Sequence, residues 1–318
     1  MDLDTLRRAL DPTWLPWLLA LGVSLPALAV LEGLALQHLA RQPYDWTHLG
    51  LSLADALGRR AVDALGLSLA APVLVWAYTH RLGTWRLDGP GPWLAVFLLH
   101  EACYYAYHRA AHRVGWFWAT HSVHHSPPAL NLACALRLGW TGKLSGTALF
   151  FSPLVLLGVP PTVVLGATAF NLVYQFWLHT TWIPRLGPLE WVFNTPSHHR
   201  VHHGSNPEYL DCNYGGVLIV YDRLLGTWVG ERDGLPPRYG LVQPLDSRNP
   251  LVIAFHGWIR LLRDVRQAGT MRGVLAVLLG PPGGARSSAL PDSRSCEQAA
   301  NAPARRLPAP GSSPRRSA

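Results

Sequence analysis

The distribution of apolar and polar positions along the chain is that of a membrane protein. Residues 14–31 form an uncharged run, and its apolar pattern continues past Glu32 to about Leu39. A helix needs about 20 apolar residues to cross the roughly 30 Å hydrocarbon core of a bilayer. Further apolar runs cover residues 61–79 and begin near Trp93. We therefore predict membrane-crossing helices in the first hundred residues.

A cleaved signal peptide is the alternative interpretation of the first run. Arg7 and Arg8 precede it, and Ala27-Leu28-Ala29 resembles a cleavage site. The apolar region of a signal peptide usually has about 7–15 residues, and this run is longer. The length favours a retained helix.

The longest uncharged segment, residues 144–178, predicts a helical hairpin. As one helix it would be about 52 Å long, too long for a single crossing. Pro160-Pro161 lies near its middle and breaks the helix. Basic residues flank both outer ends, so the positive-inside rule places both ends in the cytoplasm. These flanking residues are Arg137, Lys143 and Arg185.

The C-terminal part changes character twice. Residues 251–279 read as an Arg-studded amphipathic helix, which either lies on the cytoplasmic leaflet or packs on the rest of the chain. From residue 282 to 318 the composition shifts to Pro, Ser, Arg and Ala, which predicts a disordered tail. The expected organisation is membrane helices in residues 1–90, a central domain in 91–250 that contains the hairpin, an amphipathic helix in 251–281, and the tail.

Composition supports a membrane protein and excludes several other classes. The chain is 49% hydrophobic and 14% charged, against about 25% charged in soluble domains. Of the 27 basic residues only Lys143 is a lysine, a bias typical of a GC-rich genome. No basic stretch is interleaved with aromatic residues as a nucleic-acid groove would need, so the charge of +8 does not indicate nucleic-acid binding.

Fifteen histidines are present, and many of them form three blocks. The blocks are His108-Arg-Ala-Ala-His112, His121-Ser-Val-His124-His125 and Ser197-His198-His199-Arg-Val-His202-His203. On a helix, positions i, i+3 and i+4 share one face, so each block is expected to present its imidazoles together. Histidine is costly near a membrane unless it is paired or ligated. The blocks predict a metal site, and their number suits two ions with about four imidazoles each.

The ligand type leaves the metal open among iron, zinc and copper, which all accept imidazole. No Glu-x-x-His pair occurs, which excludes the carboxylate-bridged di-iron bundle. His100-Glu101 begins a zinc protease motif, but Tyr104 stands where its second histidine belongs.

Several runs together resemble a known family. They are the run from Glu101 to Arg109, the three histidine blocks, Leu186-Gly-Pro-Leu-Glu190-Trp191 leading into His198-His199, and Asn213-Tyr-Gly-Gly. Over about residues 95–235 the chain resembles the fatty acid hydroxylase/sterol desaturase superfamily, closest to its alkylglycerol monooxygenase-like branch. The resemblance implies an all-α integral membrane protein with about four transmembrane helices and a cytoplasmic histidine-rich cap.

The resemblance also implies a di-iron site. Its eight ligands would be His108, His112, His121, His124, His125, His199, His202 and His203. A ninth is expected in the polar stripe Asn171, Gln175 and His179, where His179 is the predicted ligand. Gln175 as a direct ligand and a simple interhelical hydrogen bond remain alternatives for this stripe. His198 is about 100° off the face of His199 and is expected beside the ligands instead of among them.

Carboxylates should accept the remaining imidazole N–H groups and fix the ring orientations. Glu101 lies seven residues before His108 on nearly the same helical face, where family members usually carry Asp. Asp222, within an apolar run, is the second candidate. The alternative for both is an ordinary ion pair with an arginine.

The implied reaction is O₂-dependent oxidation of a C–H bond in a fatty acyl, sterol or ether lipid. Hydroxylation, desaturation and ether cleavage are not separated by the sequence. Electrons would come from a partner reductase or a pterin, because no flavin, haem or dinucleotide motif is present. The expected location is a bacterial inner membrane with the histidines facing the cytoplasm. A zinc-dependent membrane hydrolase and a non-catalytic metal-binding membrane protein are the alternatives.

Overall fold

The computed structural model describes residues 15–283, and in this range the protein is all-helical. Backbone pairing between extended segments is limited there to two isolated bridges, Phe193 with Leu218 and Arg232 with Leu235. The predicted all-α fold class is confirmed.

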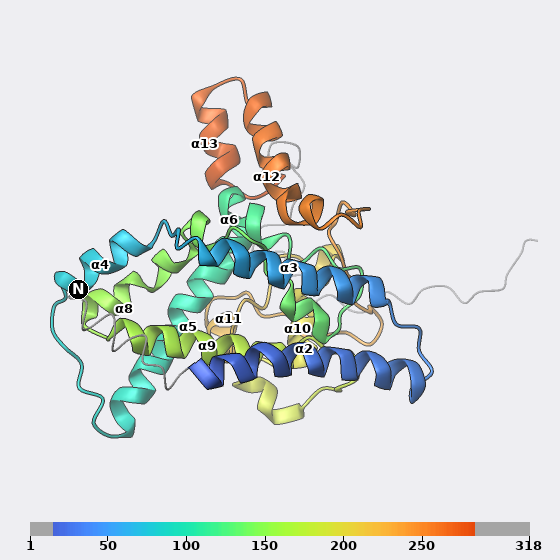
Figure 1. Ribbon diagram of the computed structural model, residues 1–318, viewed down its shortest axis with the longest axis horizontal. Helices are drawn as coiled ribbons and strands as arrows, with labels where there is room; N and C mark the ends of the chain where they lie inside the picture. Colours follow the sequence, from blue (N-terminus) through green and yellow to red (C-terminus); the bar gives the residue numbers. More distant parts are fainter. Residues whose placement is uncertain (1–14, 284–318) are drawn as a thin grey trace, which may run out of the picture.

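In the described part of the chain, five helices longer than 15 residues build the body and the projection from it. They are α2 (Leu15–His38), α3 (Trp46–Ala64), α5 (Pro90–Arg113), α9 (Pro161–Phe176) and α12 (Pro250–Gln267). In Figure 1, α2, α3 and α9 run along the long axis of the molecule, and α5 lies obliquely among them. α12 and α13 (Met271–Leu279) form a helical pair that projects from the body.

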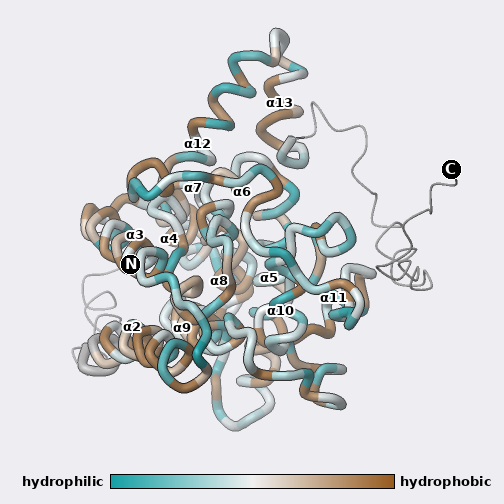
Figure 2. Tube along the Cα trace, turned by 90° about the vertical axis from the view of Figure 1, so that its right-hand side faces the viewer, coloured by the Kyte–Doolittle hydropathy of each residue, from teal (hydrophilic) through white to brown (hydrophobic). Residues whose placement is uncertain are grey.

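Short helices carry the chain between these elements. They are α4 (Ala71–Thr79), α6 (Gly115–His121), α7 (Gly142–Ser145), α8 (Ser152–Leu157), α10 (Pro196–His202) and α11 (Val220–Leu224), with 3₁₀ turns at Leu132–Leu136, Thr147–Phe151, Gly187–Trp191 and Pro207–Tyr209. Figure 2 shows α5, α10 and α11 close together on one side of the body. The histidine blocks lie on or next to α5, α6 and α10.

The predicted break in the uncharged segment is present. α8 ends at Leu157 and α9 begins at Pro161, where proline suits the first turn of a helix. Gly158 between them has φ +104°, and a Cβ there would lie 2.3 Å from the carbonyl oxygen of Gly83. The turn therefore requires glycine for both its backbone angle and its close packing.

Two helix predictions are wrong in their boundaries. Residues 61–79 are not one helix, because α3 ends at Ala64, Gly66 turns the chain with φ +69°, and α4 begins with Pro72 in its first turn. The predicted helix over 251–279 is interrupted at Gly269, whose φ is +66°. Left-handed angles end helices because they break the repeating hydrogen-bond pattern. Arg7, Arg8 and nearly all of the predicted tail lie outside the described residues.

Within residues 15–283, one helical stretch, Ala20–His38 in α2, is long and apolar enough to cross a membrane. Its side chains include exposed apolar residues such as Val23 and Leu31. Large apolar side chains are also exposed on α9, at Leu165 and Phe170. These surfaces are suited to contact with lipid.

Glu32, the one charge within the apolar stretch of α2, joins this helix to the segments around the histidines. It is buried, and its carboxylate accepts hydrogen bonds from the backbone N–H of Leu132 (2.7 Å), the indole of Trp182 (2.9 Å) and the hydroxyl of Thr180 (3.3 Å). A buried charge needs such partners. This contact holds α2 against the loop that follows α9.

Candidate metal centre

Nine histidines from four segments lie together in the interior, in two groups. The five-histidine group contains His108, His112, His121, His125 and His202. The four-histidine group contains His124, His179, His199 and His203. Within each group, one ring nitrogen of every member lies within 4.8 Å of those of the others. All of them are buried except His121, which is half-buried.

The two groups divide the sequence blocks between them. α6 ends at His121, and residues 122–125 form turns, so His124 points to one group while His121 and His125 point to the other. On α10, His199 belongs to the four-histidine group and His202 to the five-histidine group. The expectation of one helical face is therefore wrong for the second block, most of which lies beyond the end of α6. Only the first block lies wholly in one group, whereas in the other two the i,i+4 pair stays together, His121 with His125 and His199 with His203.

The nitrogen–nitrogen distances have the spacing of metal ligands. In the five-histidine group, Nε2 of His121 is 3.1 Å from Nε2 of His108 and 3.2 Å from Nε2 of His125. In the four-histidine group, Nε2 of His179 is 3.2 Å from Nε2 of His124 and 3.0 Å from Nε2 of His199. Two ligands at right angles on bonds of about 2.1 Å would be about 3.0 Å apart. The ring nitrogens surround two positions, and at each position their spacing suits the ligands of one metal ion.

Four of the rings have their tautomer fixed by backbone carbonyls. The Nδ1 atoms of His108, His124, His179 and His202 lie 2.8–3.0 Å from the carbonyl oxygens of Tyr214, Arg137, Gln175 and Cys212. Since a carbonyl only accepts, each Nδ1 must carry the proton, and each Nε2 carries a lone pair. Lone pairs that face each other at about 3 Å repel unless a cation lies between them. The chemistry of the donor set thus fits metal ions.

The surroundings also keep these rings neutral. Burial lowers the pKa of His124 and of His202 to about 4. Desolvation disfavours the charged imidazolium, and both rings are neutral at pH 7. Neutral imidazole is the form that binds metals.

The polar stripe of α9 separates into two roles. His179 belongs to the four-histidine group, whereas the side chain of Gln175 donates to Asn171 and accepts from the hydroxyl of Tyr104 at 3.0 Å. Gln175 contributes to the site through its backbone, because its carbonyl oxygen accepts a hydrogen bond from Nδ1 of the predicted ligand His179. His198 lies outside both groups, and its Nε2 accepts from the indole of Trp228 at 3.1 Å.

Glu101 does not contact any of the nine imidazoles, so its predicted partner is wrong. One carboxylate oxygen accepts from the backbone N–H groups of Val217 (2.7 Å) and Leu218 (2.9 Å). The other accepts from the side-chain amide of Asn171 at 2.6 Å. About two turns of α5 separate Glu101 from His108. At this separation the Glu101 carboxylate lies beside the backbone of residues 217 and 218 and not beside the imidazoles.

Asp222 also has no direct contact with an imidazole. Its carboxylate accepts from the backbone N–H groups of Tyr214 and Gly215 and from the hydroxyl of Thr227, each at 2.7 Å. Burial raises the pKa of Asp222 to about 7, and the three donors act in the opposite direction. The two backbone N–H groups can only donate, and they stabilise the ionised form of the carboxylate. Among the described residues, neither carboxylate forms the arginine ion pair that was the alternative.

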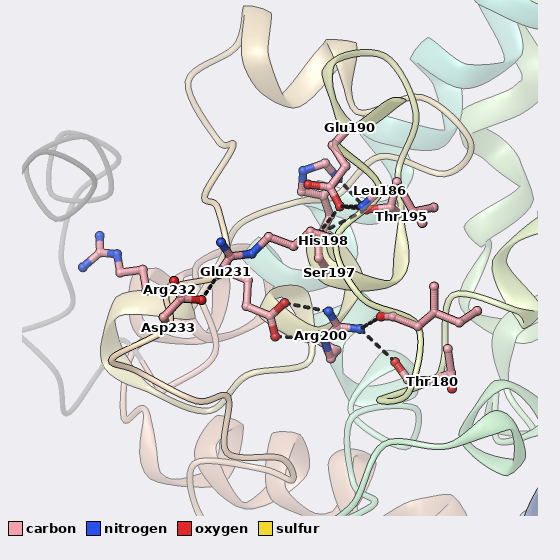
Figure 3. A network of polar contacts seen from close by, with 12 residues as sticks. Thr180, Leu186, Glu190, Thr195, Ser197, His198, Arg200, Glu231, Arg232 and Asp233 are labelled. Atoms are coloured by element: carbon pink, nitrogen blue, oxygen red, sulfur yellow. Dashed lines mark hydrogen bonds and ion pairs between the residues drawn. The ribbon is translucent and has the colours of Figure 1, made fainter. Parts of the chain in front are cut away.

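α10 is fixed by an ion pair at the middle of its histidine block (Figure 3). The guanidinium of Arg200 donates to both carboxylate oxygens of Glu231, at 2.8 and 2.6 Å, and to the carbonyl oxygen of Ile183 at 2.8 Å. Two-point contacts of this kind fix orientation as well as distance. At the start of the helix, Glu190 accepts from the hydroxyls of Thr195 and Ser197. These contacts set the direction in which His199, His202 and His203 point.

The carbonyl acceptors and Asp55, a buried aspartate on α3, were not predicted from the residue pattern. Asp55 accepts from the backbone N–H groups of Leu138 and Gly139, both at 3.0 Å. The one available signal was its spacing from the buried residues Leu51 and Ser52, which places a carboxylate on the inner face of α3.

Comparison with known proteins gives one family. The sequence model of the fatty acid hydroxylase family matches residues 93–227. This range contains all nine histidines, Glu101 and Asp222. No solved structure matches the chain.

Characterised relatives include enzymes with lipid substrates in their names. An alkylglycerol monooxygenase of Xenopus tropicalis is 38% identical over 218 residues, which cover 69% of this chain and 48% of the relative. The human alkylglycerol monooxygenase is 42% identical over 190 residues, 60% of this chain and 42% of the relative. An ornithine lipid hydroxylase of Rhizobium tropici is 32% identical over 181 residues, 56% of this chain and 53% of the relative. The chain thus spans about half the length of these relatives.

Proposed function

Because residues 93–227 belong to the fatty acid hydroxylase family, we propose that this chain is a membrane-bound monooxygenase that uses O₂ and two iron ions to oxidise a C–H bond of a lipid. The observation that carries the proposal is the pair of buried groups of five and four imidazoles, with Nε2 atoms 3.0–3.2 Å apart. When bound, the ions supply the redox chemistry that activates O₂.

The chain's own residues hold, orient and shield this site. The nine histidines would be the ligands, five for one ion and four for the other. Backbone carbonyls hold four rings with the Nε2 lone pair turned inward. Burial excludes bulk water from the space between the rings, which suits a reaction whose oxidant must meet a C–H bond instead of solvent.

Substrate and electron donor are proposed from the relatives and from the chemistry of the site. Two enzyme names among the relatives, alkylglycerol monooxygenase and ornithine lipid hydroxylase, refer to lipids. We expect an ether lipid of the alkylglycerol class as substrate, entering from the bilayer. Reducing equivalents would come from a separate reductase or a pterin.

The membrane arrangement forms part of the proposal. α2 would cross the bilayer, and the apolar first half of α5 and the α8–α9 hairpin would contribute further membrane segments, giving about four in all. The histidines would lie in a cap on the cytoplasmic side of a bacterial inner membrane. The catalytic domain would be residues 91–250, with residues 1–90 as the membrane anchor.

Single cysteines test this topology. In a chain whose native cysteines are replaced, Asp233→Cys is expected to react with an impermeant thiol reagent only from the cytoplasmic face, because Asp233 is exposed in the loop beside α10. Thr162→Cys, exposed at the start of the α9 arm, should react only from the opposite face or be shielded by lipid. Labelling of both cysteines from one aqueous face would contradict a hairpin that crosses the bilayer.

Metal content combined with oxygen uptake tests the function. Protein purified anaerobically and loaded with Fe²⁺ should hold two irons per chain, and adding reductant with an alkylglycerol should start O₂ consumption and form an oxidised lipid. Ornithine lipid and sterol serve as comparison substrates. Zinc-loaded protein that hydrolyses lipid esters without O₂ would show the alternative hydrolase, and iron-loaded protein that consumes no O₂ with any lipid would show a non-catalytic metal protein.

A further inference from the structure

The peptide group between Tyr214 and Gly215 joins a buried carboxylate to a histidine of the metal centre. Its N–H, on Gly215, donates to Asp222 at 2.7 Å. Its C=O, on Tyr214, accepts from Nδ1 of His108 at 2.8 Å. Both hydrogen bonds are short, and Asp222 and His108 are almost completely buried. Asp222 is therefore connected to His108 by a single peptide unit.

The same arrangement occurs a second time, in the other group. The N–H of the Arg137–Leu138 peptide, on Leu138, donates to Asp55 at 3.0 Å. Its C=O, on Arg137, accepts from Nδ1 of His124 at 3.0 Å. Asp55 comes from α3 and Asp222 from α11, so two elements far apart in the sequence build equivalent contacts. Each histidine group has one such connection.

We propose that Asp222 and Asp55 are positioning residues that tune one imidazole in each group through the intervening peptide. This inference rests on the proposed function, in which His108 and His124 are metal ligands. A carboxylate that accepts from a peptide N–H polarises the peptide, and the carbonyl becomes a stronger acceptor. The stronger bond to Nδ1–H holds the ring and raises the basicity of Nε2, where the metal binds.

The other two carbonyl-bonded rings lack this feature and show that it is not a general property of the site. His202 is bonded to the carbonyl of Cys212, but the N–H of the same peptide, on Asn213, donates to the backbone carbonyl of Thr227. His179 is bonded to the carbonyl of Gln175, and that peptide lies within α9. Only His108 and His124 have a carboxylate behind the carbonyl.

Glu101 provides a matched control within the same loop. It accepts from the N–H groups of Val217 and Leu218, and it is as buried as Asp222. The carbonyls of those two peptides, on Gly216 and Val217, accept from the side chain and backbone of Asn194. Glu101 thus has the same kind of backbone contact without an imidazole at the other end.

The test is the binding of Fe²⁺ alone, without O₂ or lipid, to the detergent-purified full chain. Chelator competition gives the two affinities, and ⁵⁷Fe Mössbauer spectra show which of the two irons is altered. We expect Asp222→Asn and Asp55→Asn each to weaken one iron by about 10–100-fold, and to alter different Mössbauer doublets. Glu101→Gln should lower the melting temperature and leave both iron affinities and both doublets as in the wild type.

The outcomes separate this inference from the proposed function. Wild-type protein that binds fewer than two irons would overturn the proposed function. Wild type with two irons, but Asp222→Asn and Asp55→Asn indistinguishable from Glu101→Gln, would overturn the tuning alone. The tuning is also overturned if each aspartate variant weakens the binding of both irons equally, because a general loss of packing would have that effect.

A measurement on the wild type covers the case in which an aspartate variant does not fold. Zinc-loaded protein labelled with ¹⁵N at histidine gives a signal for each Nδ1–H proton. Those of His108 and His124 are expected furthest downfield among the carbonyl-bonded rings, because a carboxylate polarises the peptide carbonyl to which each is bonded. A spectrum in which the His179 and His202 protons lie at the same position would overturn the proposal.

Discussion

Replacing His179 with alanine is expected to release the ion of the four-histidine group and to reduce lipid oxidation by at least about 100-fold, more than the loss expected for a residue that only supports a ligand. Nε2 of His179 lies 3.2 Å from that of His124 and 3.0 Å from that of His199, so it is central to the group. Its loss leaves three imidazoles in the group. Iron content should fall from two to one per chain, measured on the same preparation as the activity.

His198→Asn is the matched control, because His198 is an equally buried neighbour of His199 but lies outside both groups. Its loss removes the bond from Trp228 and should lower stability while two irons remain bound. If His179→Ala keeps two irons and wild-type turnover, His179 is not a ligand, and the four-histidine group does not hold an ion in the way proposed.

Removing the metals is expected to destabilise the folded protein and to lower its melting temperature by more than about 10 °C. A ligand present at 1,000 times its Kd stabilises the folded state by about 4 kcal/mol per site, and about 1 kcal/mol shifts the melting temperature by about 2–4 °C in chains of this size class. In the metal-free protein, the buried Nε2 lone pairs face each other without a cation between them.

Circular dichroism melting of one preparation, before and after chelation and again after adding Fe²⁺, measures this effect. Double replacement of His121 and His179 should give a melting temperature that chelator no longer changes. If wild-type melting is the same with and without metal, the imidazoles do not hold ions that contribute to folding.

The histidines could be chosen from the sequence because their chemistry is rare in an apolar chain and their spacing is local. His108 and His112 fell on one helical face as the 3.6-residue repeat requires. His179 could be selected because it continues a polar stripe along an otherwise apolar helix. In each case, the spacing of a few neighbouring residues was sufficient to predict the ligand.

Features that depend on where a helix ends were not accessible in this way. The second block leaves the helix because α6 stops at His121, and the run at 61–79 is broken because Gly66 takes a left-handed angle. The backbone partners of Glu101 are Val217 and Leu218, more than 100 residues beyond it, and only the folded chain brings them together. Local spacing carries no information about such contacts.

The peptide carbonyls that hold the imidazoles have a consequence for how this site can be found in other sequences. The groups that bond His108, His124, His179 and His202 belong to the main chain, so exchanging the side chains of Tyr214, Arg137, Gln175 or Cys212 removes none of them. Alanine substitution leaves each carbonyl in place, so an alanine scan would not report on these four hydrogen bonds. What must be inherited is the path of the backbone, which the sequence records at Gly215 and Gly216, where any Cβ would lie about 2 Å from the Leu218 carbonyl or the Asn171 amide.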